Sequence, residues 1–172
     1  MAVVIALSII LKFITIFKLP FGGSVTLAHT APLILFAFVR GYRKGVVASL
    51  IYSFINAVMF FKILPGKSAV VTVLVVFIDY FLIYAFVGLA PLYSFKIKNL
   101  KLKIFVGSTC VGVIRFCIAT FSGILFWQEY FLCEEWSVLY SMFYNGSYII
   151  PETIITTVIC CFFADYFVCF DS

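Results

Sequence analysis

The chain has 172 residues, of which 65% are hydrophobic and only 11% are charged. A soluble domain is about 45–50% apolar and about 25% charged, so this composition excludes a soluble globular domain and predicts an integral membrane protein. The formal net charge of +5 does not indicate nucleic-acid binding, because no basic patch alternates with aromatic residues outside the apolar segments. No long linker interrupts the chain, and residues 1–172 are predicted to form one domain.

Six apolar segments follow one another along the chain, and each is predicted to form a membrane-spanning helix. Such a helix needs about 20 apolar residues, and the breaks between the segments carry turn-forming residues. The first segment lacks a basic amino-terminal region and a cleavage site, which favours a helix over a signal peptide. The segments are Ala2–Phe17, Ser24–Val39, Val46–Ile63, Ser68–Leu89, Ile104–Trp127 and Ser147–Phe170. The predicted fold class is therefore all-α, an integral membrane bundle of six transmembrane helices.

The loops give the bundle an orientation, because cytoplasmic loops carry an excess of lysine and arginine. The second and fourth loops hold the basic residues Arg40, Arg43, Lys44, Lys96, Lys98, Lys101 and Lys103. The fifth loop holds Glu129, Glu134 and Glu135 and no basic residue, which suits the outer face. Both termini are therefore predicted to be cytoplasmic, in a protein that crosses the plasma membrane several times.

Four ionisable residues lie within the apolar segments, where their cost makes each one a functional candidate. Lys12, near the outer end of the first helix, is expected to extend its ammonium group to the lipid headgroups. Asp79 lies roughly 16 Å into its helix at 1.5 Å per residue, and it either pairs with Arg115 or meets a polar or cationic ligand. Arg115 is interpreted as a buried cation that holds helices together. Glu152 either contributes to a cavity or bonds a neighbouring helix.

The fifth segment carries a second pattern, in which Ala119, Gly123 and Trp127 are spaced by four and share one helix face. Small residues beside an interfacial tryptophan are typical of close helix packing, but the same space suits a flat aromatic or cationic ligand. Asn145 in "YNGSY" is formally a glycosylation sequon at the predicted membrane edge. Its amide offers donors and an acceptor that a heterocycle can use. Pro151 is expected to loosen the helix below it.

The sequence offers no pattern of a catalytic or metal centre. It has no G-x-x-x-x-G-K-[ST] motif, and a single histidine, His29, makes a histidine-based metal site improbable. The six cysteines are interpreted as small packing residues. We therefore predict no enzymatic activity, no metal and no cofactor.

Four stretches resemble the thiamine transporter family: "GGSVTLAHTAPLILFAFVRGYRKGVVASLIYSFINA", "DYFLIYAFVGLAPLYSF", "IRFCIATFSGILFWQEY" and "WSVLYSMFYNGSYIIPETIIT". The match covers nearly the whole chain in order, and "GGSVTLA" and "YNGSY-x-x-PE" are its specific motifs. Members of this family are the substrate-binding membrane subunits (S components) of energy-coupling factor (ECF) ABC importers. The resemblance implies a six-helix S-component fold that captures thiamine at the outer face with high affinity. It also implies an ECF transmembrane coupling subunit and two ATPase subunits as partners.

The resemblance further implies a ligand site lined by the fourth, fifth and sixth helices. Carried over by position, the substrate-binding residues are Asp79, Tyr80, Gly123, Trp127, Tyr140 and Asn145. The acidic residue engages polar or cationic groups of the substrate and the tryptophan stacks on a ring. The amide and the later tyrosine bind the pyrimidine edge. Ala2 and Ala6 have small-xxx-small spacing and are implied to dock on the coupling subunit.

Two positions depart from the family pattern. Asp79 stands where the family usually has glutamate, which shortens the side chain by one methylene. Ala119 stands where it usually has a pocket histidine, and the lost polar contact costs about 1–3 kcal/mol. His29 either substitutes from another wall or lies at the membrane interface. The expected ligand is therefore thiamine or a related pyrimidine compound.

Two further hypotheses stay open at this stage. One is a proton-coupled secondary transporter of thiamine or its pyrimidine precursor, with Asp79 and Glu152 as protonation sites. The other is a structural membrane protein in which an Asp79–Arg115 pair only braces the bundle.

Overall fold

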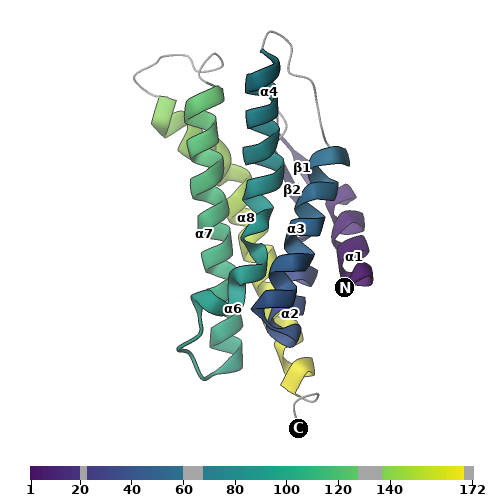
Figure 1. Cartoon of the computed structure of the whole chain (residues 1–172). Helices are drawn as coiled ribbons and strands as arrows, with labels where there is room; N and C mark the ends of the chain where they lie inside the picture. The colour runs from purple at the N-terminus through teal and green to yellow at the C-terminus, as the bar shows by residue number, and fades with distance from the viewer. Residues whose placement is uncertain (20–22, 60–67, 128–136, 169–172) are drawn as a thin grey trace.

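The computed structural model describes residues 1–19, 23–59, 68–127 and 137–168, and it is mostly helical (Figure 1). The elements in chain order are α1 (Ala2–Phe13), β1 (Thr15–Lys18), β2 (Ser24–Thr26), α2 (Ala31–Arg40), α3 (Tyr42–Met59), α4 (Ala69–Val76), the π-helical segment η2 (Phe77–Leu82), α5 (Ile83–Ala85), the 3-10 turn η3 (Val87–Leu89), α6 (Ala90–Tyr93), α7 (Leu100–Phe126) and α8 (Ser137–Val168). Figure 1 shows the long helices running side by side as a bundle, and strand β2 of the hairpin contacts α8 and α1.

Three helical stretches of the described chain are long and apolar enough to cross a membrane. They are Ala69–Tyr93, Leu100–Phe126 and Val138–Ala164. Large apolar side chains such as Val73, Phe121 and Phe162 are exposed on their outer surfaces. Because hydrocarbon rather than water is the favourable solvent for such a surface, the architecture is that of a multi-pass membrane protein.

The prediction that the fold is entirely helical is wrong between the first two segments. The first helix ends at Phe13, and β1 pairs antiparallel with β2, with Thr15 opposite Thr26 and Lys18 opposite Ser24. The β-branched residues in these stretches favour extended backbone, and a short apolar run cannot be assigned to helix or strand by periodicity alone. The expected second helix consequently begins at Ala31 instead of Ser24.

The last helix also differs from its predicted bounds. α8 begins at Ser137, ten residues before the predicted start at Ser147, because the polar residues at its head turn inward and do not end the helix. α8 continues without interruption through Pro151. The polar head of this helix is therefore part of the bundle interior.

Glycines allow α7 and α8 to approach each other closely along their length. A Cβ atom added at Gly112 would lie 2.2 Å from Cγ2 of Thr153, and one added at Gly123 would lie 2.2 Å from Oγ of Ser141. Such distances are shorter than any van der Waals contact, so a larger residue at either position would displace the facing side chain or force the two helices apart. This close pairing fixes one side of the cavity described below.

Candidate functional site

A cavity of about 700 Å³ lies between α1, the hairpin, the α4–α5 region, α7 and α8. Its volume is within the range of about 300–1,000 Å³ that is usual for small-molecule sites. All the substrate-binding residues inferred from the family resemblance line it: Asp79, Tyr80, Gly123, Trp127, Tyr140 and Asn145. These residues come from three separate elements, and the fold brings them to one space.

Asp79 forms the acidic part of the cavity wall. It lies in the π-helical segment η2, a local widening of the helix that is frequent at functional sites. Its carboxylate faces the side chains of Ser122 and Trp127. The alternative pairing with Arg115 is not found among the described residues, because Arg115 pairs with Glu152 instead.

Ala119, Gly123 and Trp127, the three residues that were predicted to share one helix face, all line the cavity. Gly123 serves helix packing as well, because the side chain of Ser141 on α8 occupies the space next to its Cα. Ser141 donates a hydrogen bond to the carbonyl oxygen of Thr120 over 2.9 Å. The two interpretations of this face are therefore compatible, since its residues line the cavity and the missing side chain at Gly123 allows the close packing of α8.

Asn145 is held in a defined orientation by its own protein partners. Its Nδ2 donates to the carbonyl oxygens of Ser141 over 2.9 Å and Ala119 over 3.3 Å. Its Oδ1 accepts a hydrogen bond from the Tyr148 hydroxyl over 2.7 Å. An amide oxygen has two lone pairs, so one acceptor position remains for a ligand. With only 6% of its surface exposed, Asn145 is not accessible as a glycosylation acceptor.

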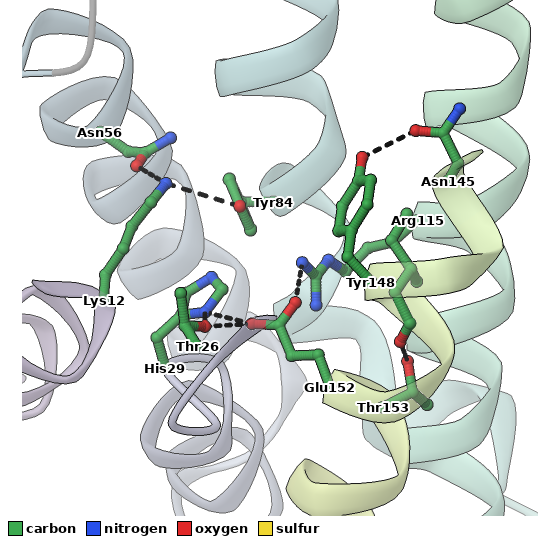
Figure 2. A network of polar contacts seen from close by, with 11 residues as sticks. Lys12, Thr26, His29, Asn56, Tyr84, Arg115, Asn145, Tyr148, Glu152 and Thr153 are labelled. Atoms are coloured by element: carbon green, nitrogen blue, oxygen red, sulfur yellow. Dashed lines mark hydrogen bonds and ion pairs between the residues drawn. The ribbon is translucent and has the colours of Figure 1, made fainter. Parts of the chain in front are cut away.

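Buried polar and ionic contacts beside the cavity join α7, α8, β2 and the turn between β2 and α2 (Figure 2). Arg115 on α7 donates to Oε2 of Glu152 on α8 over 2.9 Å. The hydroxyl of Thr26 on β2 donates to Oε1 of Glu152, and Nδ1 of His29 lies 2.6 Å from the same oxygen. A carboxylate can only accept, so Nδ1 of His29 carries the hydrogen of that contact.

These contacts decide three predictions made from the sequence. The structural interpretation of Arg115 as a cation between helices is confirmed. Glu152 does both things considered for it, since it bonds neighbouring elements and lines the cavity. The interpretation of His29 as an interface histidine is wrong, because only 1% of its surface is exposed and it lies at the junction of the hairpin and α2.

The prediction that Lys12 extends to the lipid headgroups is wrong. Its side chain turns into the bundle. Its Nζ donates to Oδ1 of Asn56 on α3 and lies 3.5 Å from the hydroxyl of Tyr84 (Figure 2). The ammonium also lies 4.7 Å from the centre of the Tyr84 ring. Polar and π partners inside the bundle therefore replace water and lipid headgroups around this cation.

Several residues of the cavity were not identified from the sequence. Those with polar side chains are Thr15, Lys18, Ser24, Thr26, Tyr84, Ser141, Tyr144 and Tyr148. One signal was available, since Tyr140, Tyr144, Tyr148 and Glu152 recur at intervals of four residues and so share a helix face. The hairpin residues gave no such signal, because their segment was assigned to helices.

An apolar helical bundle that encloses a polar and aromatic cavity is the architecture of a membrane protein whose interior suits a small polar molecule. A family model described as "Thiamine transporter protein (Thia_YuaJ)" matches residues 1–168, and the chain belongs to this family. It is 22% identical over 171 residues to the thiamine transporter ThiT of Bacillus subtilis (strain 168), a match that covers 93% of this chain and 85% of that protein. The protein is therefore a membrane transporter of the thiamine family and not an enzyme.

A solved structure shares the fold. ThiT from Listeria monocytogenes superposes with a TM-score of 0.72 at 19% sequence identity, and the alignment covers 96% of this chain and 91% of that one. At this identity, the likeness establishes the common architecture, and the roles of individual side chains rest on the geometry described above.

Proposed function

We propose that this protein is the high-affinity thiamine-binding S component of an ECF-type ABC importer, and that it captures the vitamin at the outer face of the plasma membrane. The observation that carries the proposal is the convergence of a carboxylate, an amide, several phenols and an indole on one cavity. Thiamine carries a cationic thiazolium ring and an aminopyrimidine, and these groups complement those side chains.

In the proposed complex each of these side chains has a part that its position in the cavity supports. The Asp79 carboxylate and the face of the Trp127 indole favour a flat cationic ring. Oδ1 of Asn145 accepts from the exocyclic amine of the pyrimidine, while Tyr140 supplies a second polar contact at that edge. Tyr80 and Gly123 form the adjoining walls, and the missing side chain at Gly123 lets Ser141 and Asn145 of α8 lie close to this wall.

The departure at Ala119 bears on which ligand is preferred. His29 lines the same cavity, but its Nδ1 is already bonded to Glu152 and its Nε2 is buried, so we propose that it does not replace the polar contact that the family usually has at position 119. The ligand is then thiamine or a related pyrimidine compound, held chiefly through Asp79, Trp127 and Asn145.

We further propose how the bundle lies in the membrane and with what it assembles. Six crossings are formed by α1, α2, α3, the α4–α6 stretch, α7 and α8, with both termini in the cytoplasm. Ala2 and Ala6 are exposed and lie one turn apart on α1, which suits close docking of a transmembrane coupling subunit. Two ATPase subunits supply the energy for release, since the sequence has no nucleotide-binding motif.

A proton-coupled secondary transporter is the alternative hypothesis. It requires carboxylates that exchange protons during transport, and Glu152 is engaged by Arg115, Thr26 and His29. Asp79 is then the remaining candidate of the two. Uptake by vesicles that lack the ATPase subunits, abolished by an uncoupler, supports this alternative, and its absence supports the ECF assignment.

The proposed function is tested by titrating the purified, detergent-solubilised protein with thiamine and following tryptophan fluorescence. We expect saturable quenching that is lost in Trp127→Phe and kept in Trp136→Phe, which removes the chain's other tryptophan. Parallel titrations with thiamine phosphates and with the pyrimidine precursor rank the ligands. The absence of quenching by every one of these compounds contradicts the proposal.

A further inference from the structure

The hairpin β1–β2 forms one wall of the cavity but has little stabilisation of its own. Its strands contain only four and three residues, and an isolated two-stranded hairpin is marginally stable at best. Ile16 and Phe17 are 57% and 60% exposed, so they contribute little packing within the bundle. The position of this wall therefore depends on where the hairpin is attached to other elements.

The first attachment lies at the start of β2. The backbone N–H of Gly23 donates to the hydroxyl of Tyr144 on α8 over 2.9 Å. A Cβ atom at Gly23 would lie 2.9 Å from that hydroxyl and 2.9 Å from Cδ1 of Tyr148. The backbone of the hairpin thus rests directly on two tyrosines of α8, at a distance that only glycine permits.

The second attachment is Glu152, at the other end of β2. Its Oε1 accepts from Thr26 and His29, and its Oε2 accepts from Arg115 (Figure 2). Glu152 is 1% exposed, and both of its oxygens are used by the protein. We therefore assign its carboxylate to holding β2 and the start of α2 against α7 and α8, and not to contacting a ligand.

Both attachments lie on one face of α8. Tyr144, Tyr148 and Glu152 are spaced by four residues, so they form a single stripe along the helix. Tyr148, in the middle of the stripe, donates to Oδ1 of Asn145 over 2.7 Å. The face of α8 that holds the hairpin is therefore continuous with the amide that is proposed to bind the pyrimidine.

We propose that Tyr144 and Glu152 are positioning residues that fix the hairpin wall and thereby set how long the ligand stays in the cavity. This inference rests on the proposed function for the identity of the ligand, but the attachment of the hairpin does not. When an attachment is lost, the wall separates from α8 more often, and a bound molecule leaves through the widened gap. Association is less affected, because an open wall does not hinder entry.

Two mild substitutions test the proposal without leaving a buried charge unpaired. Tyr144→Phe removes the acceptor for Gly23, and Thr26→Val removes one donor to Glu152 while the Arg115–Glu152 pair is kept. Matched controls are Tyr166→Phe, at an exposed ring of α8, and Thr153→Val, whose hydroxyl bonds only within α8, to the carbonyl oxygen of Ile149. Each control makes the same chemical change as its test variant, the loss of a tyrosine or a threonine hydroxyl, at a position that does not contact the hairpin.

The first readout is hydrogen–deuterium exchange of the full-length protein in nanodiscs without ligand. We expect exchange at residues 15–26 to rise about two- to tenfold in each test variant, the effect of a single hydrogen bond, and to stay unchanged in both controls and in α7. Unchanged exchange of the hairpin in both test variants overturns the proposal. This readout is independent of any ligand contact that Tyr144 or Thr26 makes.

The second readout is the rate of thiamine dissociation, followed by the recovery of Trp127 fluorescence after the complex is diluted to a concentration well below its dissociation constant. We expect dissociation to be about two- to tenfold faster in the test variants, with association rates close to wild type. Faster hairpin exchange with unchanged dissociation refutes the link to residence time. If the wild-type protein binds none of the thiamine compounds, the proposed function fails, while the exchange measurement still decides the attachment.

Discussion

The substitution Gly123→Ala probes the point where helix packing and the cavity wall meet. The added Cβ would lie 2.2 Å from Oγ of Ser141 and 3.4 Å from Nδ2 of Asn145. Ser141 cannot turn away without losing its hydrogen bond to the carbonyl oxygen of Thr120. The methyl group therefore displaces either α8 or the side chains that orient Asn145. Gly146→Ala is a matched control on α8, because its Cβ would meet Ile150 at 3.4 Å and Phe116 at 3.6 Å, which are ordinary contacts.

The two substitutions gain the same helix propensity, but only Gly123→Ala also overpacks the interior. Replacing a helical glycine by alanine stabilises a helix by about 0.8–1.0 kcal/mol. Overpacking a filled interior costs typically about 1–3 kcal/mol. Gly146→Ala is therefore expected to stabilise the protein by up to about 1 kcal/mol, whereas Gly123→Ala is expected to be neutral to about 2 kcal/mol destabilising.

The assay is thermal unfolding in detergent combined with a thiamine titration followed by tryptophan fluorescence. We expect Gly123→Ala to unfold at a lower temperature than Gly146→Ala and to bind thiamine about tenfold or more weakly, which corresponds to about 1.4 kcal/mol. Gly146→Ala should bind thiamine as the wild-type protein does. If the two variants unfold at the same temperature and bind thiamine equally well, the packing argument at Gly123 is refuted.

Three further substitutions have expected outcomes. Asp79→Asn removes the charge facing the thiazolium ring. Because close charge pairs contribute about 1.5–7 kcal/mol, a fluorescence titration should show about tenfold or more weaker thiamine binding and a smaller loss for the uncharged pyrimidine precursor. Equal losses for both ligands count against a cation site. Lys12→Met leaves Oδ1 of Asn56 without its donor and should destabilise the protein by about 1 kcal/mol, so an unchanged melting temperature argues against this contact. Arg115→Met leaves a buried carboxylate unpaired and should cost about 3–5 kcal/mol in thermal unfolding, and adding Glu152→Gln should restore part of that loss if the pair is formed as described.

The membrane class and most helices could be predicted from the sequence, because long apolar runs have few other stable solutions. Asp79, Arg115 and Glu152 could be selected for the same reason, since a polar atom in hydrocarbon is costly unless it has a partner. Gly123 and Trp127 followed from spacing by four residues. The membership of Tyr80 and Tyr140 in the cavity was inferred from the family resemblance alone.

The partners of these side chains could not be predicted, because they depend on how the helices are turned towards one another. Asp79 and Arg115 were expected at a similar depth in the membrane, which allowed an ion pair between them. The way α7 and α8 are turned places Arg115 next to Glu152 instead. Lys12 lies near a helix end, where extension to the headgroups is usual, yet Asn56 and Tyr84 lie within its reach inside the bundle.

The hairpin was missed for a different physical reason. Its residues lie in apolar runs that read as the ends of two helices, and strand pairing between β1 and β2 is a tertiary feature without a distinctive local pattern. His29 was misplaced for the same reason. It was expected on a helix that begins at Ser24, but it lies in the turn between β2 and α2.

The central claim is that Asp79, Trp127 and Asn145 surround a single thiamine-like ligand. An experimental structure of the protein crystallised with thiamine tests it most directly. We expect the ligand in the cavity between α7, α8 and the hairpin, with a ring stacked on Trp127, its amine within hydrogen-bonding distance of Oδ1 of Asn145, and Asp79 next to it. A ligand bound elsewhere on the protein, with this cavity filled only by water, would contradict the account.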